Sequence, residues 1–289
     1  TGTGTWDLGG TSTFTGGVTV SDGTLTVKSG ASLAAANDLT LSGGTLNLDH
    51  ATQTVASLAG SGGTINFGTG HILTLAQITA TSYAGVLAGS GGFTLSGSGG
   101  SLTLSGGSAN TYAGNTTINE GTLILAKTPG TPAIAGGTIT VGNGAGTDIL
   151  RLGASHQIGN SANLTLAGGS FQLNNFSETL AALKLDASYT IDFGSTASAL
   201  VFADSSAQSW TGTLTIANYT TASGNSLRFG ATASGLTSGQ LAQISFTGYG
   251  AGVTIDGSGY VSPIPEPGTY AVLAGLAALA LAARRRRRS

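Results

Sequence analysis

Short runs of alternating aliphatic and polar residues recur along the chain, and they come in pairs around a glycine. The fullest pair reads Val-Thr-Val-Ser-Asp-Gly-Thr-Leu-Thr-Val over residues 18–27, and similar pairs occupy residues 39–48, 164–173 and, less completely, 116–125. A period of two places the aliphatic side chains on one face of a strand and Thr, Asn or Gln on the other. Each pair therefore predicts two half-buried β-strands joined at a glycine corner.

The glycine corners recur at a nearly regular interval. Neighbours lie 21, 19 and 16 residues apart within the set Gly23, Gly44, Gly63, Gly121 and Gly137. A degenerate repeat of roughly twenty residues is typical of a solenoid, in which each repeat forms one turn and packs against the next.

Two architectures compete for this pattern. Asp22-Gly23 between alternating strands is a strong hairpin signal, and a chain of hairpins would form a meander, sandwich or barrel. Each motif is, however, followed by about ten less regular residues, enough to complete one turn of a helix of strands. The sequence therefore favours an all-β fold, a parallel β-helix or β-solenoid with glycine at its corners and threonine on its outer faces.

The repeat length also predicts a size and a domain organisation. At roughly twenty residues and ~4.8 Å per turn, residues 1–262 predict about thirteen turns and a rod on the order of 60 Å long. We expect residues 1–178 to form solenoid repeats, and residues 179–262 to form the final turns and a C-terminal cap, because Trp210 and much of the aromatic content fall there. A solenoid needs such a cover at its end.

Residues 263–289 differ from the rest in composition. A proline-rich stretch is followed by an unbroken apolar run over residues 271–283, five arginines and a serine. Residues 269–283 predict a short hydrophobic helix of about 22 Å, against a bilayer core of about 30 Å. Arginine stays on the cytoplasmic side while an apolar stretch enters the bilayer. This tail indicates contact with the membrane, transient or as an anchor, with everything upstream outside.

The tail resembles the PEP-CTERM sorting signal of Gram-negative bacteria. The resemblance rests on Pro265, Glu266 and Pro267, on the apolar helix over 269–283, and on the arginines Arg284, Arg285, Arg286, Arg287 and Arg288. It implies export to the cell surface or the extracellular matrix of a bacterium that makes exopolysaccharide. It also implies processing near the Pro-Glu-Pro by an exosortase-type enzyme, with the arginines held on the cytoplasmic side.

One internal segment resembles a second family, the autotransporter-associated β-strand repeat. Residues 102–125 read Leu-Thr-Leu-Ser-Gly-Gly-Ser-Ala-Asn-Thr-Tyr-Ala-Gly-Asn-Thr-Thr-Ile-Asn-Glu-Gly-Thr-Leu-Ile-Leu. The family pattern is Leu-Thr-Leu-Ser-Gly, Asn-Thr-Tyr-Thr-Gly and Gly-Thr-Leu, so that Ala113 departs from it at one position. The resemblance implies a right-handed parallel β-helix of the kind found in large bacterial surface proteins.

Composition narrows the function classes. The chain contains no cysteine, which excludes disulfides, thiol nucleophiles and thiolate metal sites. Half of its ten basic residues are the arginines of the tail, so residues 1–262 hold five basic and eleven acidic residues, a net charge of −6. A mildly acidic body without a basic face predicts no nucleic-acid partner.

Candidate chemistry is sparse, and we predict no catalytic residue, cofactor or metal ligand. Asp186, Asp192 and Asp204 form the densest acidic group, but a twenty-residue repeat does not align them on adjacent turns. The loop Asn143-Gly-Ala-Gly-Thr-Asp148 is close to a calcium-binding nonapeptide, yet a single copy cannot bridge successive turns. The histidines are predicted at the surface or at corners, at His50, His71 and His156.

These observations favour a non-enzymatic structural or adhesive protein of the cell surface, associated with exopolysaccharide or a biofilm matrix. Its stiff rod would present hydroxyl-rich faces able to contact carbohydrate. The alternatives are a polysaccharide lyase or hydrolase with the β-helix fold and an adhesin with a specific receptor. An enzyme would lose activity on polysaccharides when Asp186, Asp192 or Asp204 is changed.

Overall fold

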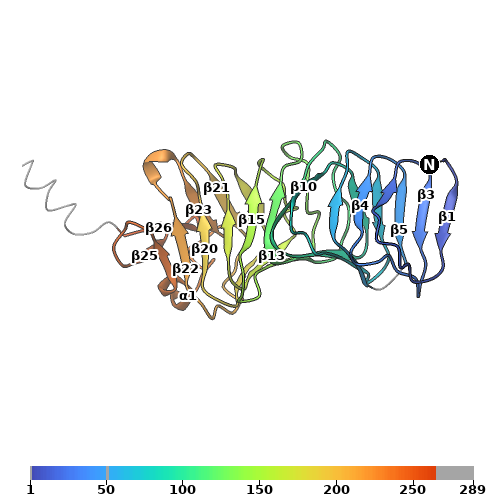
Figure 1. Cartoon of the computed structure of the whole chain (residues 1–289). Coiled ribbons are helices and arrows are strands. Elements are labelled where there is room, and N and C mark those ends of the chain that lie inside the picture. Colours follow the sequence, from blue (N-terminus) through green and yellow to red (C-terminus); the bar gives the residue numbers. More distant parts are fainter. Residues whose placement is uncertain (1, 50–51, 265–289) are drawn as a thin grey trace, which may run out of the picture.

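The computed structural model describes residues 2–49 and 52–264. It is an elongated β-structure with β1 (Thr5–Leu8) at one end and β25 (Val253–Ile255) and β26 (Tyr260–Pro263) at the other (Figure 1). The strands wind into about ten turns of a parallel β-solenoid. Among the described residues only two strand pairs, β23–β26 and β25–β26, are antiparallel.

The strands form three parallel ladders, face 1, face 2 and face 3, which the chain visits in this order as it winds along the solenoid. Face 1 holds β1, β3 (Thr24–Val27), β5 (Thr45–Leu48), β8 (Thr64–Phe67), β11 (Val86–Gly89), β18 (Glu178–Leu180), β21 (Ala199–Phe202) and β23 (Ser226–Phe229). Face 2 holds β6 (Thr52–Val55), β9 (Ile72–Leu75), the first parts of β12 (Gly92–Leu104) and β13 (Thr116–Leu125), β14 (Thr138–Val141), β16 (Asn163–Leu166) and β19 (Leu183–Leu185).

Face 3 completes each turn. It holds β2 (Val18–Val20), β4 (Asp38–Leu41), β7 (Ser57–Ala59), β10 (Ala80–Tyr83), the second parts of β12 and β13, β15 (Asp148–Leu152), β17 (Ser170–Gln172), β20 (Tyr189–Asp192), β22 (Leu214–Ala217) and β24 (Ile244–Phe246). The two long strands β12 and β13 run through a corner and so belong to two faces.

The glycine corners act as the alternating pattern predicts. β2 and β3 flank Gly23 but do not pair with one another: β2 pairs with β4, and β3 pairs with β1 and β5. Gly23 has φ +66°, and a Cβ at this position would overlap the carbonyl oxygen of Gly4 on the preceding turn. Only glycine fits such a close left-handed corner. The parallel β-helix is therefore confirmed, and the hairpin interpretation is wrong.

Aliphatic side chains fill the interior in columns. On face 1, Leu25, Leu46, Ile65 and Leu87 are register partners on successive turns. The last three are almost completely buried. Burying one such side chain contributes about 1.5–3 kcal/mol, and each turn repeats the gain on three faces. The regular core explains why a chain with so few charges folds.

The turns are longer than the sequence predicts towards the C-terminus. The paired residues Thr5 and Thr24 are 19 positions apart, whereas the paired Ala199 and Ser226 are 27 apart. The prediction of about thirteen turns is therefore wrong, and about ten turns at ~4.8 Å give a solenoid of roughly 48 Å. Corner loops of variable length account for the extra residues.

Antiparallel strands follow the last parallel turns. β25 and β26 form a hairpin that pairs with β23, and α1 (Ser238–Ala242) precedes β24. The other helix is the short 3₁₀ turn η1 (Thr221–Ser223). Except for Pro263 at the end of β26, these elements lie within residues 179–262, and the domain bounds stay a prediction. In the described ranges 2–49 and 52–264, no helix is long and apolar enough to span a membrane.

Candidate functional site

The predicted sorting residues lie outside the described part of the chain. These are Pro265, Glu266 and Pro267, the helix over 269–283 and the arginines 284–288. The last described residues belong to the terminal hairpin: Pro263 is the register partner of Val253, and the Ile264 backbone N–H donates to the Gly252 carbonyl at 3.0 Å. The described part of the chain thus ends at Ile264, in the terminal hairpin at the end of the solenoid opposite β1.

The three aspartates considered for catalysis lie on different sides of one turn. Asp186 follows β19 of face 2, Asp192 ends β20 of face 3, and Asp204 follows β21 of face 1. Asp186 pairs with Lys184 at 2.8 Å, and Asp192 accepts from the Gly194 backbone and from Asn218 at 2.8 Å each. Hydrogen bonds from Ser206 lower the pKa of Asp204. The turn therefore separates these carboxylates rather than bringing them together.

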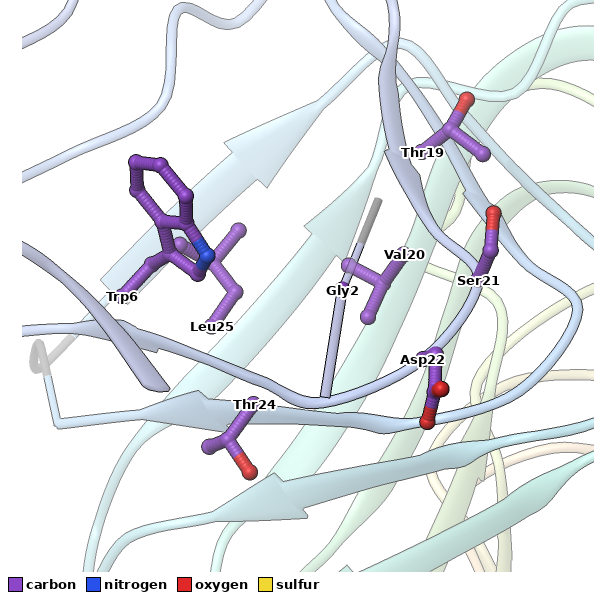
Figure 2. Close-up of a pocket in the computed structure, with 8 residues that line it drawn as sticks. All are labelled: Gly2, Trp6, Thr19, Val20, Ser21, Asp22, Thr24 and Leu25. Atoms are coloured by element: carbon purple, nitrogen blue, oxygen red, sulfur yellow. The ribbon is translucent and has the colours of Figure 1, made fainter. Parts of the chain in front are cut away.

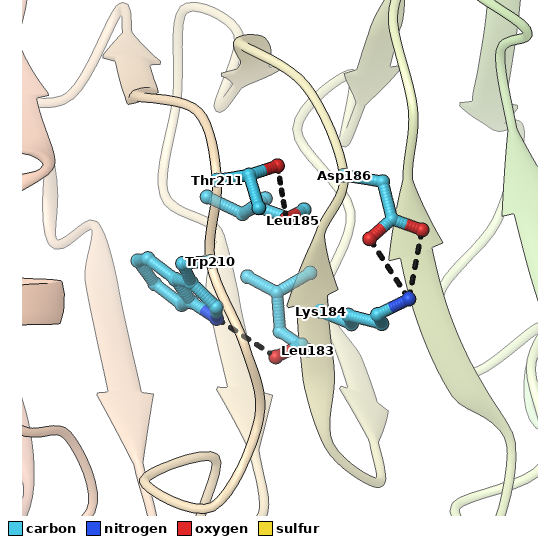
Figure 3. A network of polar contacts seen from close by, with 6 residues as sticks. All are labelled: Leu183, Lys184, Leu185, Asp186, Trp210 and Thr211. Atoms are coloured by element: carbon cyan, nitrogen blue, oxygen red, sulfur yellow. Dashed lines mark hydrogen bonds and ion pairs between the residues drawn. The ribbon is translucent and has the colours of Figure 1, made fainter.

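Figure 3 shows the surroundings of the Lys184–Asp186 ion pair. Trp210 lies on the next turn, where it takes the place of a strand of face 2 and forms an isolated bridge with Leu185. Its indole N–H donates to the Leu183 carbonyl at 3.0 Å, and the Thr211 hydroxyl donates to the Leu185 carbonyl at 3.3 Å. Trp210 therefore holds two turns together.

Asp148, the aspartate of the calcium-like loop, is buried and points into the solenoid. It is 2% exposed, and its Oδ1 atom has no hydrogen-bond partner in the described part of the chain. Burial, followed by the nearby charge of Glu120, raises the pKa of Asp148 to about 6. Residues 2–49 and 52–264 contain no group of three His, Asp or Glu side chains able to hold a metal ion.

Two of the histidines occupy corner positions. His71 Nδ1 donates to the Leu48 carbonyl at 2.8 Å, and His156 adopts a left-handed conformation with φ +56°. The third, His50, lies outside the described residues.

A series of buried polar groups, which sequence patterns do not predict, crosses the middle of face 1. Lys127 is 1% exposed, and its Nζ donates to the carbonyls of Gly85 at 3.0 Å and Ser105 at 2.8 Å. Its backbone N–H donates to Gln157 Oε1 at 2.7 Å. The Gln157 backbone N–H donates in turn to Glu178 Oε2 at 2.6 Å. The side chains of Lys127, Gln157 and Glu178 thus connect residues on five successive turns.

The two charged members of this series have shifted pKa values. Burial lowers the pKa of Lys127 to about 8 and raises that of Glu178 to about 7. Both shifts have the same cause, because removal from water disfavours the charged form of either group. Since these side chains are buried inside the solenoid, we assign the group to stability rather than to chemistry.

The end of the solenoid at β1 carries a hollow of about 310 Å³ (Figure 2). Its lining includes Trp6, which is 70% exposed, together with Asp22, Thr24 and Leu25. β1 has a neighbouring strand, β3, on one side. Its side chains are therefore more exposed than those of the later strands.

The outer surface of face 2 carries an unbroken threonine ladder. One outward position on six successive turns is threonine, and the register then continues to Lys184: the ladder consists of Thr54, Thr74, Thr94, Thr117, Thr140 and Thr165. Neighbouring strands of a sheet lie about 4.8 Å apart, which fixes the spacing of the hydroxyls. Within residues 52–264, none of these six hydroxyls has a protein hydrogen-bond partner.

Face 3 carries a second column, in which Ile149 interrupts a run of Ser and Thr residues. Its outward register positions are Ser101, Thr122, Ile149, Ser170, Thr190 and Thr215. The neighbouring column on this face is mixed and includes Arg151, whose Nε donates to Gln172 Oε1 at 2.7 Å. The threonine column of face 2 holds no charge before Lys184, and the nearest acidic residue on its strands is Glu120 of β13, opposite Ser96.

Two protein-family models and one known protein match parts of this chain. Residues 1–27 and 98–125 match the model of the passenger-associated-transport-repeat, and residues 263–288 match that of the PEP-CTERM protein-sorting motif. The chain is similar to the adhesin BmaC autotransporter of Brucella suis biovar 1 (strain 1330), with 42% identity over 85 residues. That similarity covers 29% of this chain and 2% of the relative's length. No solved structure matches the chain.

The two resemblances seen in the sequence are therefore confirmed. The second repeat match, residues 98–125, includes the segment 102–125 on which the resemblance rests. Fold and motifs together define the class: a parallel β-solenoid with passenger-type repeats and a C-terminal protein-sorting motif.

Proposed function

We propose that this chain is a non-enzymatic adhesive stalk of the bacterial cell surface, delivered by its C-terminal signal and associated with exopolysaccharide or a biofilm matrix. An exosortase-type enzyme recognises the signal and processes the chain near Pro265, Glu266 and Pro267. The apolar segment 269–283 contacts the membrane during this step, and Arg284–Arg288 stay on the cytoplasmic side.

The observation that carries the proposal is the match of residues 263–288 to a protein-sorting motif, joined to a solenoid of passenger-type repeats. The similarity to an adhesin supports an adhesive role. The two hydroxyl columns support carbohydrate as the contact, because hydroxyl groups can both donate to and accept from sugar hydroxyls.

The enzymatic alternative has little support in the geometry. Glycoside hydrolysis needs two carboxylates that flank one bond, about 5–9.5 Å apart. Asp186, Asp192 and Asp204 each follow or end a strand on a different face, and Asp186 is already paired with Lys184.

Intact-mass analysis of the protein recovered from its native surface tests the sorting step. We expect a mass that lacks the residues after Pro267 and a surface or matrix fraction as the location. A Glu266→Ala variant should keep its full mass and collect in the membrane fraction. A full-length mass for both proteins at the surface would overturn processing and leave the tail as a plain anchor.

A further inference from the structure

A shallow groove lies beside the threonine ladder where β9, β12 and β13 follow one another on face 2. It has a volume of about 340 Å³ and is lined along the ladder by Thr94 and Thr117. Its other lining residues include His71, Ile72 and Asn115, with glycines between them. The groove therefore spans three successive turns and runs across the strands, along the axis of the solenoid.

The bottom of the groove follows from close backbone packing. Gly91, Gly92 and Gly114 lie where a Cβ would overlap the backbone of the adjoining turn. Because side chains are sterically excluded there, the sheet is hollowed at this point, whereas bulkier residues remain on both sides. The shape is thus a fixed property of the fold rather than a gap between mobile side chains.

The lining combines the two kinds of contact that sugars make. Ile72 is 42% exposed and offers an apolar platform for the C–H face of a pyranose ring. The hydroxyls of Thr94 and Thr117 have no hydrogen-bond partner among residues 2–49 and 52–264, and they can bond sugar hydroxyls. His71 donates from Nδ1 to the Leu48 carbonyl, which leaves Nε2 as an acceptor. Asn115 Oδ1 accepts from the Thr138 N–H at 3.1 Å, and its NH₂ group has no acceptor in the described part of the chain, so that it can donate to a sugar.

We propose that this groove binds an uncharged polysaccharide, with the sugar chain running along the solenoid axis over the threonine ladder. The occupant is uncharged because none of the residues that line the groove is Asp, Glu, Lys or Arg. The spacing of about 4.8 Å between turns is close to the length of one pyranose in an extended β-linked chain. Successive turns can therefore repeat similar weak contacts, and the contacts add through multivalency.

This proposal rests on the proposed association with exopolysaccharide and names the face that makes the contact. The test is native affinity electrophoresis of the full chain in mild detergent, in gels that contain galactomannan, xyloglucan or alginate. We expect a neutral polysaccharide, galactomannan or xyloglucan, to retard the protein more than the acidic alginate does.

Variants separate the groove from the rest of the surface. Thr94→Val together with Thr117→Val removes two hydroxyls at constant shape, and we expect about tenfold weaker retardation. Thr190→Val together with Thr215→Val makes the same change on face 3 and is the matched control. Unchanged circular dichroism and melting temperature show that both variants fold.

Each outcome decides between the claims. If the control weakens binding and the groove variant does not, the groove is wrong while association with polysaccharide stands. Retardation by alginate alone contradicts an uncharged occupant in the same way. If none of the three polysaccharides retards the wild-type chain, both the groove and the association with polysaccharide fail, whatever the intact mass says about sorting.

Discussion

Face 1 is built in two different ways along the solenoid. In the first five turns it is a regular ladder of five strands, from β1 to β11, whose backbone groups pair directly. Between β11 and β18 the described residues contain no strand on this face, although isolated backbone bonds continue, such as Thr111 N–H to the Leu87 carbonyl at 2.8 Å. Side-chain hydrogen bonds replace the missing ladder bonds there.

In the turns between β11 and β18, buried amide and carboxylate side chains take the place of backbone hydrogen-bonding groups. Asn110 accepts from the Leu87 N–H at 3.0 Å and donates to the Ala133 carbonyl at 2.7 Å. Glu178 accepts from the N–H groups of Gln157 and Ile158. Pro132 is one reason for this arrangement, because it has no backbone N–H that could donate to a neighbouring strand. The comparison teaches that a solenoid face can continue without strands, at the cost of burying polar groups.

Replacing Glu178 by Ala should cause the largest loss of stability, and the loss should fall in the middle turns of face 1. The N–H groups of Gln157, Ile158 and Thr179 would lose their acceptor, and a buried unsatisfied N–H costs about 1–3 kcal/mol. We expect the free energy of unfolding to fall by about 3–5 kcal/mol. Urea unfolding measures the loss, and amide exchange should locate it near residues 156–180.

Asn47→Ala is the control for this variant. Asn47 lies on the same face in the regular part, and its side chain makes only long bonds, at 3.5 Å to Thr26 and 3.4 Å from Asn66. Its loss should cost no more than about 0.5 kcal/mol. Equal effects of the two substitutions would show that the series of buried polar groups is not what supports the middle turns.

The stability of the middle turns should depend on pH in an unusual way. Glu178 keeps its proton in the folded state up to about pH 7, whereas the unfolded chain loses it near 4.5. The folded state therefore binds more protons between these values, and the free energy of unfolding falls as pH rises, by up to about 3 kcal/mol. Lys127 has a folded pKa of about 8 and an unfolded value near 10.5, so stability rises again above pH 8.

The expected result is a stability minimum between about pH 7 and 8. Thermal melts across pH 4 to 10.5 would show it. In Glu178→Gln the fall between about pH 6 and 7 should flatten, while the fall that buried Asp148 contributes below about pH 6 and the rise above pH 8 remain. A wild-type melting temperature that climbs from pH 4.5 to 7 would contradict the buried state of Glu178.

The sequence reveals the regular part of this molecule far better than the middle. Alternation and glycine corners such as Gly23 predict parallel strands, because one local pattern sets both burial and chain direction. Lys127 and Glu178 give no such signal: a lone charge in a sequence looks the same whether it meets water or the carbonyls of another turn. Likewise, the six threonines of face 2 lie about twenty residues apart, and only the register of the turns brings them into one column.

Lys127→Met should have a smaller effect than Glu178→Ala. The carbonyls of Gly85 and Ser105 lose a donor, but a buried charge of unfavourable solvation is removed at the same time. We expect a net loss of about 1–2 kcal/mol in urea unfolding at pH 7. The rise of stability above pH 8 should disappear in this variant; if it persists, another group titrates there.

Thr140→Val should have the smallest effect on stability. This variant tests whether the hydroxyls of the threonine ladder stabilise the fold. Thr140 lies in the threonine ladder of face 2, outside the groove, and its hydroxyl bonds no group in the described part of the protein. Valine has the same shape and a strong preference for strands, so the free energy of unfolding should change by no more than about 0.5 kcal/mol. Urea unfolding tests this directly. A loss above 1 kcal/mol would mean that the ladder hydroxyls support the fold, like the series of buried polar groups of face 1; a neutral result leaves them free to contact a ligand.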